Sequence, residues 1–435
     1  MENMKLEDVG KIEIVKGEGQ RESVKVTIWC VTYNHRDYIE KALNGFVKQK
    51  TKFNYEVLVF DDASTDGTSD IVRQYVKKYP EIIKGYLAHT NTYNHPDRKR
   101  LSADFVKAHA SGKYIAFCEG DDYWIYDYKL QKQYDWMESY PNTSLCVHNA
   151  IRYDEQKKEV LPQIMDMDSQ YLDPEEVFFC RKGRVPAASY FFRKEYWDTL
   201  PSFYDACPVG DEPLRWWLTH NGDVYYMDKV WSVRNYMHDG SWNKKIVSDL
   251  NFYQNYLRRF EKSILLADEE TNYRFHKLFE ERVTERCLAD VGLVLPKNYT
   301  IYDLQYRIEE CIKNSYPELE KYYREAYGVY KRGSQEYLNR VFEVAKENND
   351  NFYIYGAGIE ARKYAQIIWD RGIDFKGFVV SKRNEDAQRE LMGKPIYEYK
   401  SLLNKLDSIF WLCMNYKNRE EVATVLTKEG ITQYW

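Results

Sequence analysis

Several features that identify common protein classes are missing from this sequence. No Cys-x-x-Cys pair occurs among its eight scattered cysteines, which favours free thiols in a reducing cytoplasm. Residues 1–10 are polar and acidic and lack the apolar core of a signal peptide. No run approaches the roughly 18 apolar residues of a membrane span. We therefore expect a cytoplasmic protein whose only membrane contact would be peripheral, at the inner face.

Neither sign of charge dominates. The 63 basic and 68 acidic residues leave a net charge of -5, so nucleic acid is not an expected partner. Hydrophobic residues at 44% and charged residues at 30% are typical of a soluble globular protein. A chain of 435 residues predicts two to three domains. The forty tyrosines suit carbohydrate surfaces, although ordinary core packing explains most of them.

The first half of the chain alternates apolar strands with amphipathic helices, which predicts a parallel sheet covered on both faces. Strands are expected at residues 24–31, 55–60, 83–87, 114–118 and 144–153, and helices at 37–48, 67–79, 101–110 and 129–139. We predict a tail at 1–21, an α/β domain at 22–248, a helical linker domain at 249–348 and a small α/β domain at 349–435.

Acidic side chains follow two of the expected strands. Asp61 and Asp62 come after one of them, and Glu119, Asp121 and Asp122 come after another. Because ligands of an open α/β sheet gather outside the carboxyl ends of its strands, both groups should meet at one crevice. Crowded carboxylates repel one another and usually hold a divalent cation, for which Mn²⁺ or Mg²⁺ is the expected cofactor. The pattern predicts a nucleotide-phosphate site.

Four motifs in order resemble those of the family 2 nucleotide-sugar glycosyltransferases of the GT-A fold. They are Val31-Thr-Tyr-Asn34, Asp61-Asp-Ala-Ser-Thr-Asp-Gly-Thr68, Glu119-Gly-Asp-Asp122 and Gly210-Asp-Glu-Pro-Leu214, within roughly residues 22–245. The resemblance implies a metal-dependent, inverting transfer of a sugar from a nucleotide diphosphate, expected to be UDP. The implied acceptor is a hydroxyl of a glycan or lipid-linked glycan in bacterial cell-surface polysaccharide synthesis.

The resemblance also implies donor-binding roles. Val31, Thr32 and Tyr33 would lie against the nucleoside, Asp62 would accept a hydrogen bond from the uracil ring, and Asp121 would lie near the ribose. Other polar residues of the same loop are equally well explained as turn or cap residues, namely Asp61, Ser64 and Asp66.

For the metal, Asp122 matches a direct ligand. Glu119 stands where the family has Asp, and we expect it to support the ion through water or to hold its ligands. His238 would complete the shell or touch the diphosphate, unless it is a packing histidine. The family's Arg-Asn pair is replaced here by Ala103-Asp104, which leaves Arg98 or Arg100 for a phosphate contact.

Asp211 stands where inverting members place their catalytic base. A carboxylate there would take the proton of the acceptor hydroxyl while the metal stabilises the leaving diphosphate. The neighbouring Glu212 is the alternative base, and a helix-capping role for Asp211 is the structural alternative. Arg234 is a candidate phosphate contact or a solvated surface residue.

In the tail, Gly356-Ala-Gly-Ile-Glu-Ala361 has the Gly-x-Gly-x-x-Ala spacing between an expected strand and helix. The unit resembles small Rossmann-like modules attached to several bacterial polysaccharide enzymes. Ser381 stands where a dinucleotide site needs an acid, so no NAD is expected. A catalytically silent binding or assembly module is the alternative function. The tyrosine-rich helices of residues 250–347 leave a homo-oligomer or a membrane contact open.

Overall fold

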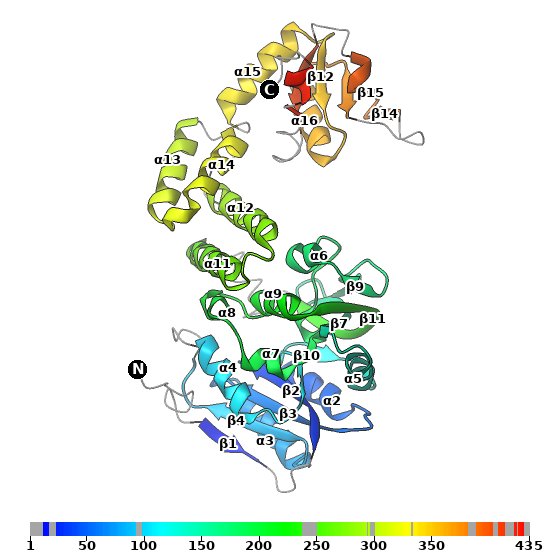
Figure 1. The fold of residues 1–435 in the computed structure, drawn as a ribbon, viewed down its shortest axis with the longest axis vertical. Coiled ribbons are helices and arrows are strands. Elements are labelled where there is room, and N and C mark those ends of the chain that lie inside the picture. Colours follow the sequence, from blue (N-terminus) through cyan, green and yellow to red (C-terminus); the bar gives the residue numbers. More distant parts are fainter. Residues whose placement is uncertain are drawn as a thin grey trace. The chain divides into compact units, whose positions relative to one another are not determined.

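The computed structural model describes residues 12–16, 23–92, 98–236, 250–293, 295, 301–331, 334–381, 389–402, 408–413, 422–423 and 425–429. They belong to two compact units, residues 1–286 and 287–435, which are treated separately below (Figure 1). The predicted division of the chain at residues 249 and 349 stays a prediction.

The first unit is built on one mixed sheet, which has eleven strands within the described ranges. Its main path runs β1-β4-β3-β2-β5-β10-β7-β11-β6, with β8 paired to β7 and β9 to β11. The pairs β2–β3, β3–β4, β2–β5 and β7–β11 are parallel. The strands are β1 (Ile12–Val15), β2 (Val24–Thr32), β3 (Asn54–Asp61), β4 (Ile83–Ala88), β5 (Tyr114–Phe117), β6 (Tyr123–Trp124), β7 (Thr143–Asp154), β8 (Glu159–Leu161), β9 (Gln170–Leu172), β10 (Phe191–Arg193) and β11 (Asp223–Tyr236).

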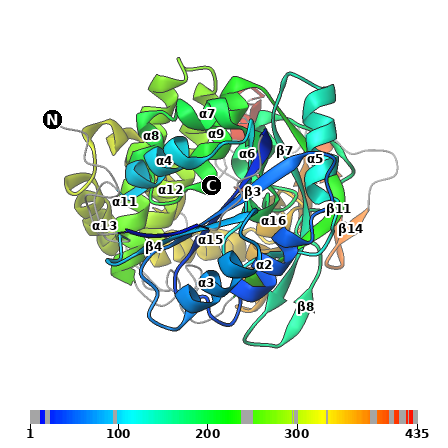
Figure 2. The ribbon, with the colours of Figure 1, turned by 90° about the horizontal axis from the view of Figure 1, so that it is seen from below.

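Helices cover both faces of this sheet (Figure 2). On one face, α2 (Ile39–Val47) and α3 (Thr68–Lys78) pack on inward strand residues such as Ile28. On the other, Phe105 of α4 (Arg98–His109) contacts Trp29 and Phe60, with ring centroids 5.7 and 5.5 Å apart. The remaining helices are α5 (Lys129–Ser139), α6 (Pro174–Phe179), α7 (Lys194–Asp198), α8 (Ser202–Ala206), α9 (Asp211–Asn221), α11 (Leu250–Glu270) and α12 (His276–Gly292), the last of which crosses the boundary between the units.

The α/β fold predicted from the alternating pattern is confirmed, with the expected strands close to β2, β3, β4, β5 and β7. The short antiparallel strand β10 between β5 and β7 was not expected. Three residues carry too little periodicity to be recognised as a strand. All eight cysteines are free thiols. Within the described ranges, no helix combines the length and apolar character needed to cross a membrane.

The second unit contains a smaller sheet beside several helices. Its parallel strands lie in the order β15-β13-β12-β16, the third-second-first-fourth arrangement of doubly wound folds, with β14 antiparallel at the edge. The strands are β12 (Phe352–Tyr355), β13 (Gly377–Val380), β14 (Glu390–Leu391), β15 (Lys394–Glu398) and β16 (Ile409–Leu412). The helices are α13 (Ile301–Lys313), α14 (Glu320–Lys331), α15 (Gln335–Glu347) and α16 (Ile359–Trp369).

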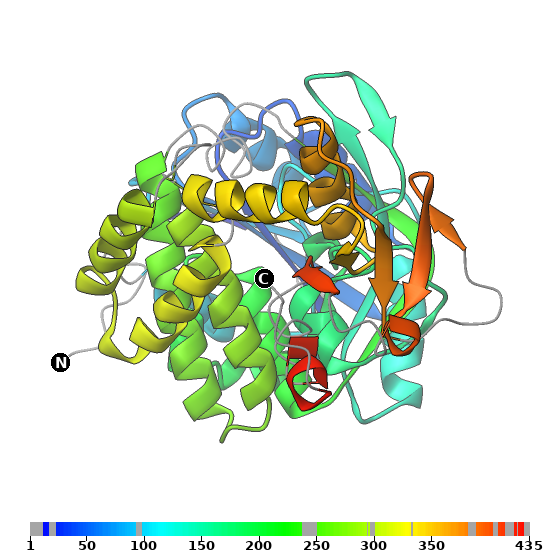
Figure 3. The same cartoon turned by 90° about the horizontal axis from the view of Figure 1, so that it is seen from above.

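Helix α15, yellow in Figure 3, packs on this sheet, since Val341 and Ala345 share a core with Ile354. The glycine motif opens here as a tight turn. Gly356 adopts a φ of 126°, and a Cβ at this position would come within 2.7 Å of the Cys413 carbonyl oxygen. Close packing therefore accounts for this glycine without any ligand.

Candidate active site

A cleft of about 340 Å³ opens at the carboxyl ends of β2, β3 and β5. Four acids from three motifs line it together: Asp62, Glu119, Asp122 and Asp211. The acidic groups thus meet at one crevice, as expected from their places at strand ends. Apolar and aromatic side chains form much of the remaining wall, including Trp29, Val31, Phe60, Trp197 and Tyr204.

The loops after β2 and β3 hold each other through side-chain to backbone hydrogen bonds. Asp61 Oδ1 accepts from the Ser64 N–H at 3.1 Å, and Ser64 Oγ accepts from the Asn34 N–H at 2.8 Å. Asp66 Oδ2 accepts from the Arg36 N–H at 2.9 Å. Asp66 Oδ1 also accepts from the Thr68 N–H at 3.0 Å. The bonds of Asp61 and Asp66 within their own loop support the turn interpretation, and those of Ser64 and Asp66 to the other loop join the two loops.

Asp62 is held differently. Its side chain is buried, and its Oδ1 accepts from both the N–H and the hydroxyl of Thr92, at 2.7 and 2.9 Å. These two bonds fix the carboxylate at the cleft wall. Among the predicted nucleoside-wall residues, Val31 lines the cleft and Tyr33 is 43% exposed outside the cleft lining. Thr32 is buried beneath the turn Glu119–Asp122, called the acidic turn below.

The acidic turn after β5 packs tightly against β2. The Gly120 N–H donates to the Val31 carbonyl at 2.9 Å, and a Cβ at Gly120 would come within 2.6 Å of Thr32 Oγ1. Asp122 is 6% exposed, and its Oδ1 accepts from the Asn235 N–H at 3.0 Å. Glycine at 120 is therefore required for the turn to reach its place beside the cleft.

Electrostatic strain is concentrated in this turn. Burial and the neighbouring Asp121 carboxylate raise the pKa of Asp122 well above its usual value. Enclosure by protein and the charge of Asp121 raise the pKa of Glu119 to about 7, although its side chain is accessible from the cleft. A bound cation would relieve this repulsion.

The oxygen donors of the turn suit Mn²⁺ or Mg²⁺. Raised pKa values are typical of carboxylates crowded together without a cation. Still, no group of three or more His, Cys, Asp or Glu side chains within the described ranges is arranged to hold a metal. Such an ion would need further ligands, such as phosphate oxygens. His238 lies outside the described residues. Arg98 and Arg100 stand in the first turn of α4, and their side chains are not among those described.

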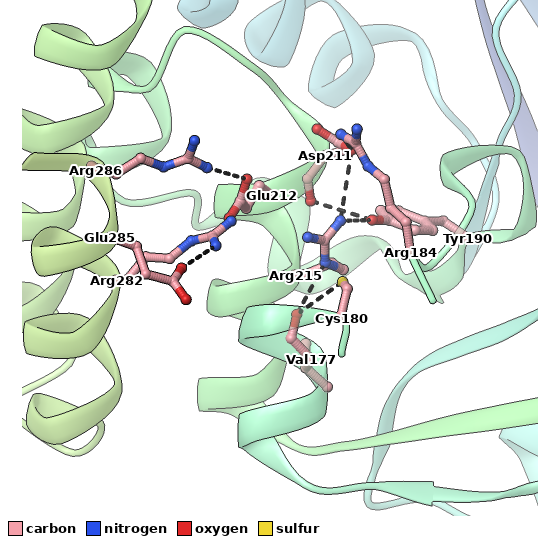
Figure 4. A network of polar contacts seen from close by, with 10 residues as sticks. All are labelled: Val177, Cys180, Arg184, Tyr190, Asp211, Glu212, Arg215, Arg282, Glu285 and Arg286. Atoms are coloured by element: carbon pink, nitrogen blue, oxygen red, sulfur yellow. Dashed lines mark hydrogen bonds and ion pairs between the residues drawn. The ribbon is translucent and has the colours of Figure 1, made fainter. Parts of the chain in front are cut away.

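Asp211 faces the cleft from the first turn of α9, beside two arginines (Figure 4). Its Oδ2 lies 3.0 Å from Arg184 Nη2 and 3.6 Å from Arg215 Nη1. Burial alone would raise the pKa of Asp211, but Arg184 and Arg215 outweigh it and lower that pKa to about 2. Gly210 occupies the cap position, so Asp211 is the first helical residue and not the cap.

Glu212 points away from the cleft toward α12. Glu212 is 4% exposed. Its carboxylate accepts a hydrogen bond from Arg282 and lies 3.7 Å from Arg286 Nη2. It is absent from the cleft lining. Of the two acids weighed as a base, only Asp211 is therefore placed to meet a ligand.

Residues 27–199 match the family model described as glycosyl transferase family 2. The match begins within β2 and ends just after α7, so this family 2 region contains Asp62 and the acidic turn and ends before Asp211. Asp211 is placed in the site by the cleft geometry alone.

Curated proteins are similar to part of the chain. The chain is 30% identical over 235 residues to the uncharacterized protein Rv1520 of Mycobacterium tuberculosis, covering 53% of this chain and 64% of that protein. TuaG of Bacillus subtilis, named as a glycosyltransferase of teichuronic acid biosynthesis, is 37% identical over 112 residues, 26% of this chain and 41% of its own. Among solved structures, Staphylococcus aureus TarS 1–349 with UDP-GlcNAc has a TM-score of 0.46 at 17% identity, covering 72% of this chain and 93% of that one.

Two arginines of the cleft were poorly predicted from the sequence. Arg184 was not named as a site residue, and Arg234 was named only as a phosphate contact or a solvated surface residue. Arg184 follows Gly183, whose φ of 120° turns the loop and whose missing Cβ avoids the Ile164 carbonyl. Arg234 of β11 also lines the cleft. Its charge partly offsets the raised pKa values of Glu119 and Asp122 and adds to the lowering of the pKa of Asp211. An arginine in a loop does not by itself indicate a site, so the preceding glycine was the one feature of the sequence that could have drawn attention to Arg184.

Proposed function

We propose that this protein is a metal-dependent, inverting glycosyltransferase that moves a sugar from a nucleotide diphosphate, a UDP-sugar, to a hydroxyl of a glycan. The observation that carries the proposal is the presence of Asp62, the acidic turn and Asp211 in one cleft. The family 2 match over residues 27–199 supports the same class of reaction.

Each acid has a part in this proposal. Asp62, held by Thr92, accepts a hydrogen bond from the uracil ring, and Asp121 lies near the ribose. Among the described residues, Asp122 would bind the metal directly, and Glu119 would lie beside it. When bound, Mn²⁺ or Mg²⁺ would neutralise charge on the diphosphate as it leaves. Val31, which lines the cleft, packs against the nucleoside.

Asp211 takes the proton of the acceptor hydroxyl as that oxygen attacks the anomeric carbon from the face opposite the diphosphate. One displacement inverts the anomeric centre, and no covalent enzyme intermediate is needed. A pKa of about 2, set by the neighbouring arginines, is low for a general base. That value is the observation that favours the alternative function, a catalytically silent module that binds the nucleotide.

The relatives support an acceptor in cell-surface polysaccharide synthesis. TuaG is named for teichuronic acid biosynthesis, and a poly(ribitol-phosphate) beta-glucosyltransferase of Bacillus spizizenii is 37% identical over 101 residues, 23% of this chain and 15% of its own. We propose a glycan or lipid-linked glycan acceptor, met at the cytoplasmic side of the membrane through peripheral contact. We also propose that the protein forms a homo-oligomer.

A panel of UDP-sugars, assayed for hydrolysis and for transfer with and without Mn²⁺, tests the function. Asp211→Asn should lower turnover by about 10²–10⁴-fold while the variant still binds the nucleotide at least as tightly as the wild type. Asp70→Asn is the matched control, because Asp70 is an exposed residue of α3, and this variant should keep full turnover. Nucleotide binding by the wild type with no turnover on any donor would favour the silent module.

A further inference from the structure

The two arginines that contact Asp211 are held very differently. Arg215 is 2% exposed, and its guanidinium donates to the Tyr190 hydroxyl at 2.8 Å and to the Val177 carbonyl at 3.4 Å. Arg184 contacts the same Asp211 oxygen with a side chain that is 38% exposed and lines the cleft (Figure 4). Arg215 is thus a fixed part of the core, whereas Arg184 can turn.

The charges of the cleft give Arg184 a reason to turn. The lining holds four carboxylates, and its described cations are Arg184 and Arg234. A phosphate entering this cleft is repelled by the carboxylates and attracted by the guanidiniums, which bind phosphate oxygens in a bidentate geometry. Asp211, which already accepts from Arg184, and an incoming phosphate would therefore compete for the same guanidinium.

We propose that Arg184 exchanges the Asp211 carboxylate for a phosphate oxygen of the ligand, so that phosphate binding releases Asp211 to accept a proton. This inference rests on the proposed function, since it needs a phosphate-bearing ligand in this cleft. The phosphate belongs to the donor diphosphate or to a phosphate-bearing acceptor, and the chemistry at Arg184 is the same for both.

The exchange explains how a carboxylate with so low a pKa serves as a base. After burial, which acts in the opposite direction, Arg184 is the largest influence on the pKa of Asp211 and lowers it. When its guanidinium turns to phosphate, that pKa rises toward the range of a useful general base. Arg215 keeps its place and still orients the carboxylate.

Calorimetric titration of the full chain with UDP, uridine and glycerol 1-phosphate tests the exchange without requiring turnover. Arg184→Gln should weaken binding of the phosphate-bearing probe about tenfold and leave uridine unchanged. Asp211→Asn should tighten the same probe severalfold, because Arg184 then has no competing carboxylate. In the double variant Asp211→Asn with Arg184→Gln, this gain should disappear.

The probes separate the two sources and the two hypotheses. An effect on UDP supports the donor diphosphate, and an effect on glycerol 1-phosphate alone supports an acceptor phosphate. Arg184→Lys should recover part of the affinity, and thermal melting checks that each variant is folded. If UDP binds the wild type but neither variant changes any phosphate affinity, or if Asp211→Asn tightens UDP equally without Arg184, the exchange is wrong. If no probe binds the wild type, the proposed function fails as well.

Discussion

Asp211 and Glu212 are neighbours in sequence, yet their carboxylates have different arginine partners on different sides of α9. Asp211 Oδ2 lies 3.0 Å from Arg184 at the cleft, while Glu212 Oε2 lies 3.7 Å from Arg286 on α12. Consecutive residues on a helix point about 100° apart, and here Asp211 lines the cleft whereas Glu212 does not. In the proposed function, Asp211 therefore serves the chemistry, and Glu212 is expected to serve stability.

Glu212→Gln should therefore destabilise the protein by about 3–5 kcal/mol, because it leaves the poorly exposed Arg282 and Arg286 without their shared carboxylate. Chemical denaturation followed by circular dichroism measures the loss. Glu285→Gln is the matched control, since Glu285 pairs with the same Arg282 but is 42% exposed. Its expected cost is below about 1 kcal/mol. Equal effects of the two substitutions would contradict the assignment.

Asp122→Asn should make the metal-free protein more stable at neutral pH. The folded-state pKa of Asp122 is raised above 3.8, so its favourable contribution is complete below that pH and is lost as the pH rises. The variant should therefore melt at a higher temperature than the wild type at pH 7, and the difference should vanish near pH 4. Melting temperatures across this range measure it.

The same variant tests the metal. Millimolar Mn²⁺ should raise the melting temperature of the wild type and not that of Asp122→Asn, because a ligand stabilises only the state it binds. A wild-type protein indifferent to Mn²⁺ and Mg²⁺, with and without UDP, would count against the cation.

Gly120→Ala should distort the acidic turn. The added Cβ would lie 2.6 Å from Thr32 Oγ1 and 2.8 Å from Thr32 Cβ, and Thr32 is a buried β-branched residue whose Cβ cannot move without its backbone. We expect a loss of about 1–3 kcal/mol and impaired Mn²⁺ binding. Gly210→Ala is the control, since its Cβ would meet only the Tyr204 hydroxyl, at 3.4 Å. Comparable losses in both variants would show that the turn is not the cause.

Asp62→Asn should weaken UDP and uridine binding by about tenfold, the equivalent of roughly 1.4 kcal/mol for one altered charge-assisted hydrogen bond. Because the base is the contact in question, both ligands should lose affinity equally. Competition binding with cytidine shows whether selectivity for uracil falls too. A variant that retains uridine affinity would remove Asp62 from base recognition.

Much of the fold and half of the site could be predicted from local pattern. Strand ends at Asp61 and Phe117 follow from apolar runs, and the carboxyl ends of parallel strands must meet. The turn roles of Ser64 and Asp66 likewise follow from their residue types and their place between a strand and a helix.

What the sequence could not predict depends on contacts between distant segments. Arg184 reaches Asp211 across 27 positions of the chain, and Arg282 reaches Glu212 across 70. The hydrophobic periodicity of the sequence does not predict such long-range pairs. The choice between Asp211 and Glu212 rested on motif position alone, whereas the structure separates them by the helix face each occupies.

The Glu212 ion pairs have a consequence for any attempt to study the catalytic part alone. A fragment ending at residue 248 would keep Glu212 and discard Arg282 and Arg286, so a buried carboxylate would stand without cations. A version that continues to the end of α12 at Gly292 retains both arginines and leaves this helix whole.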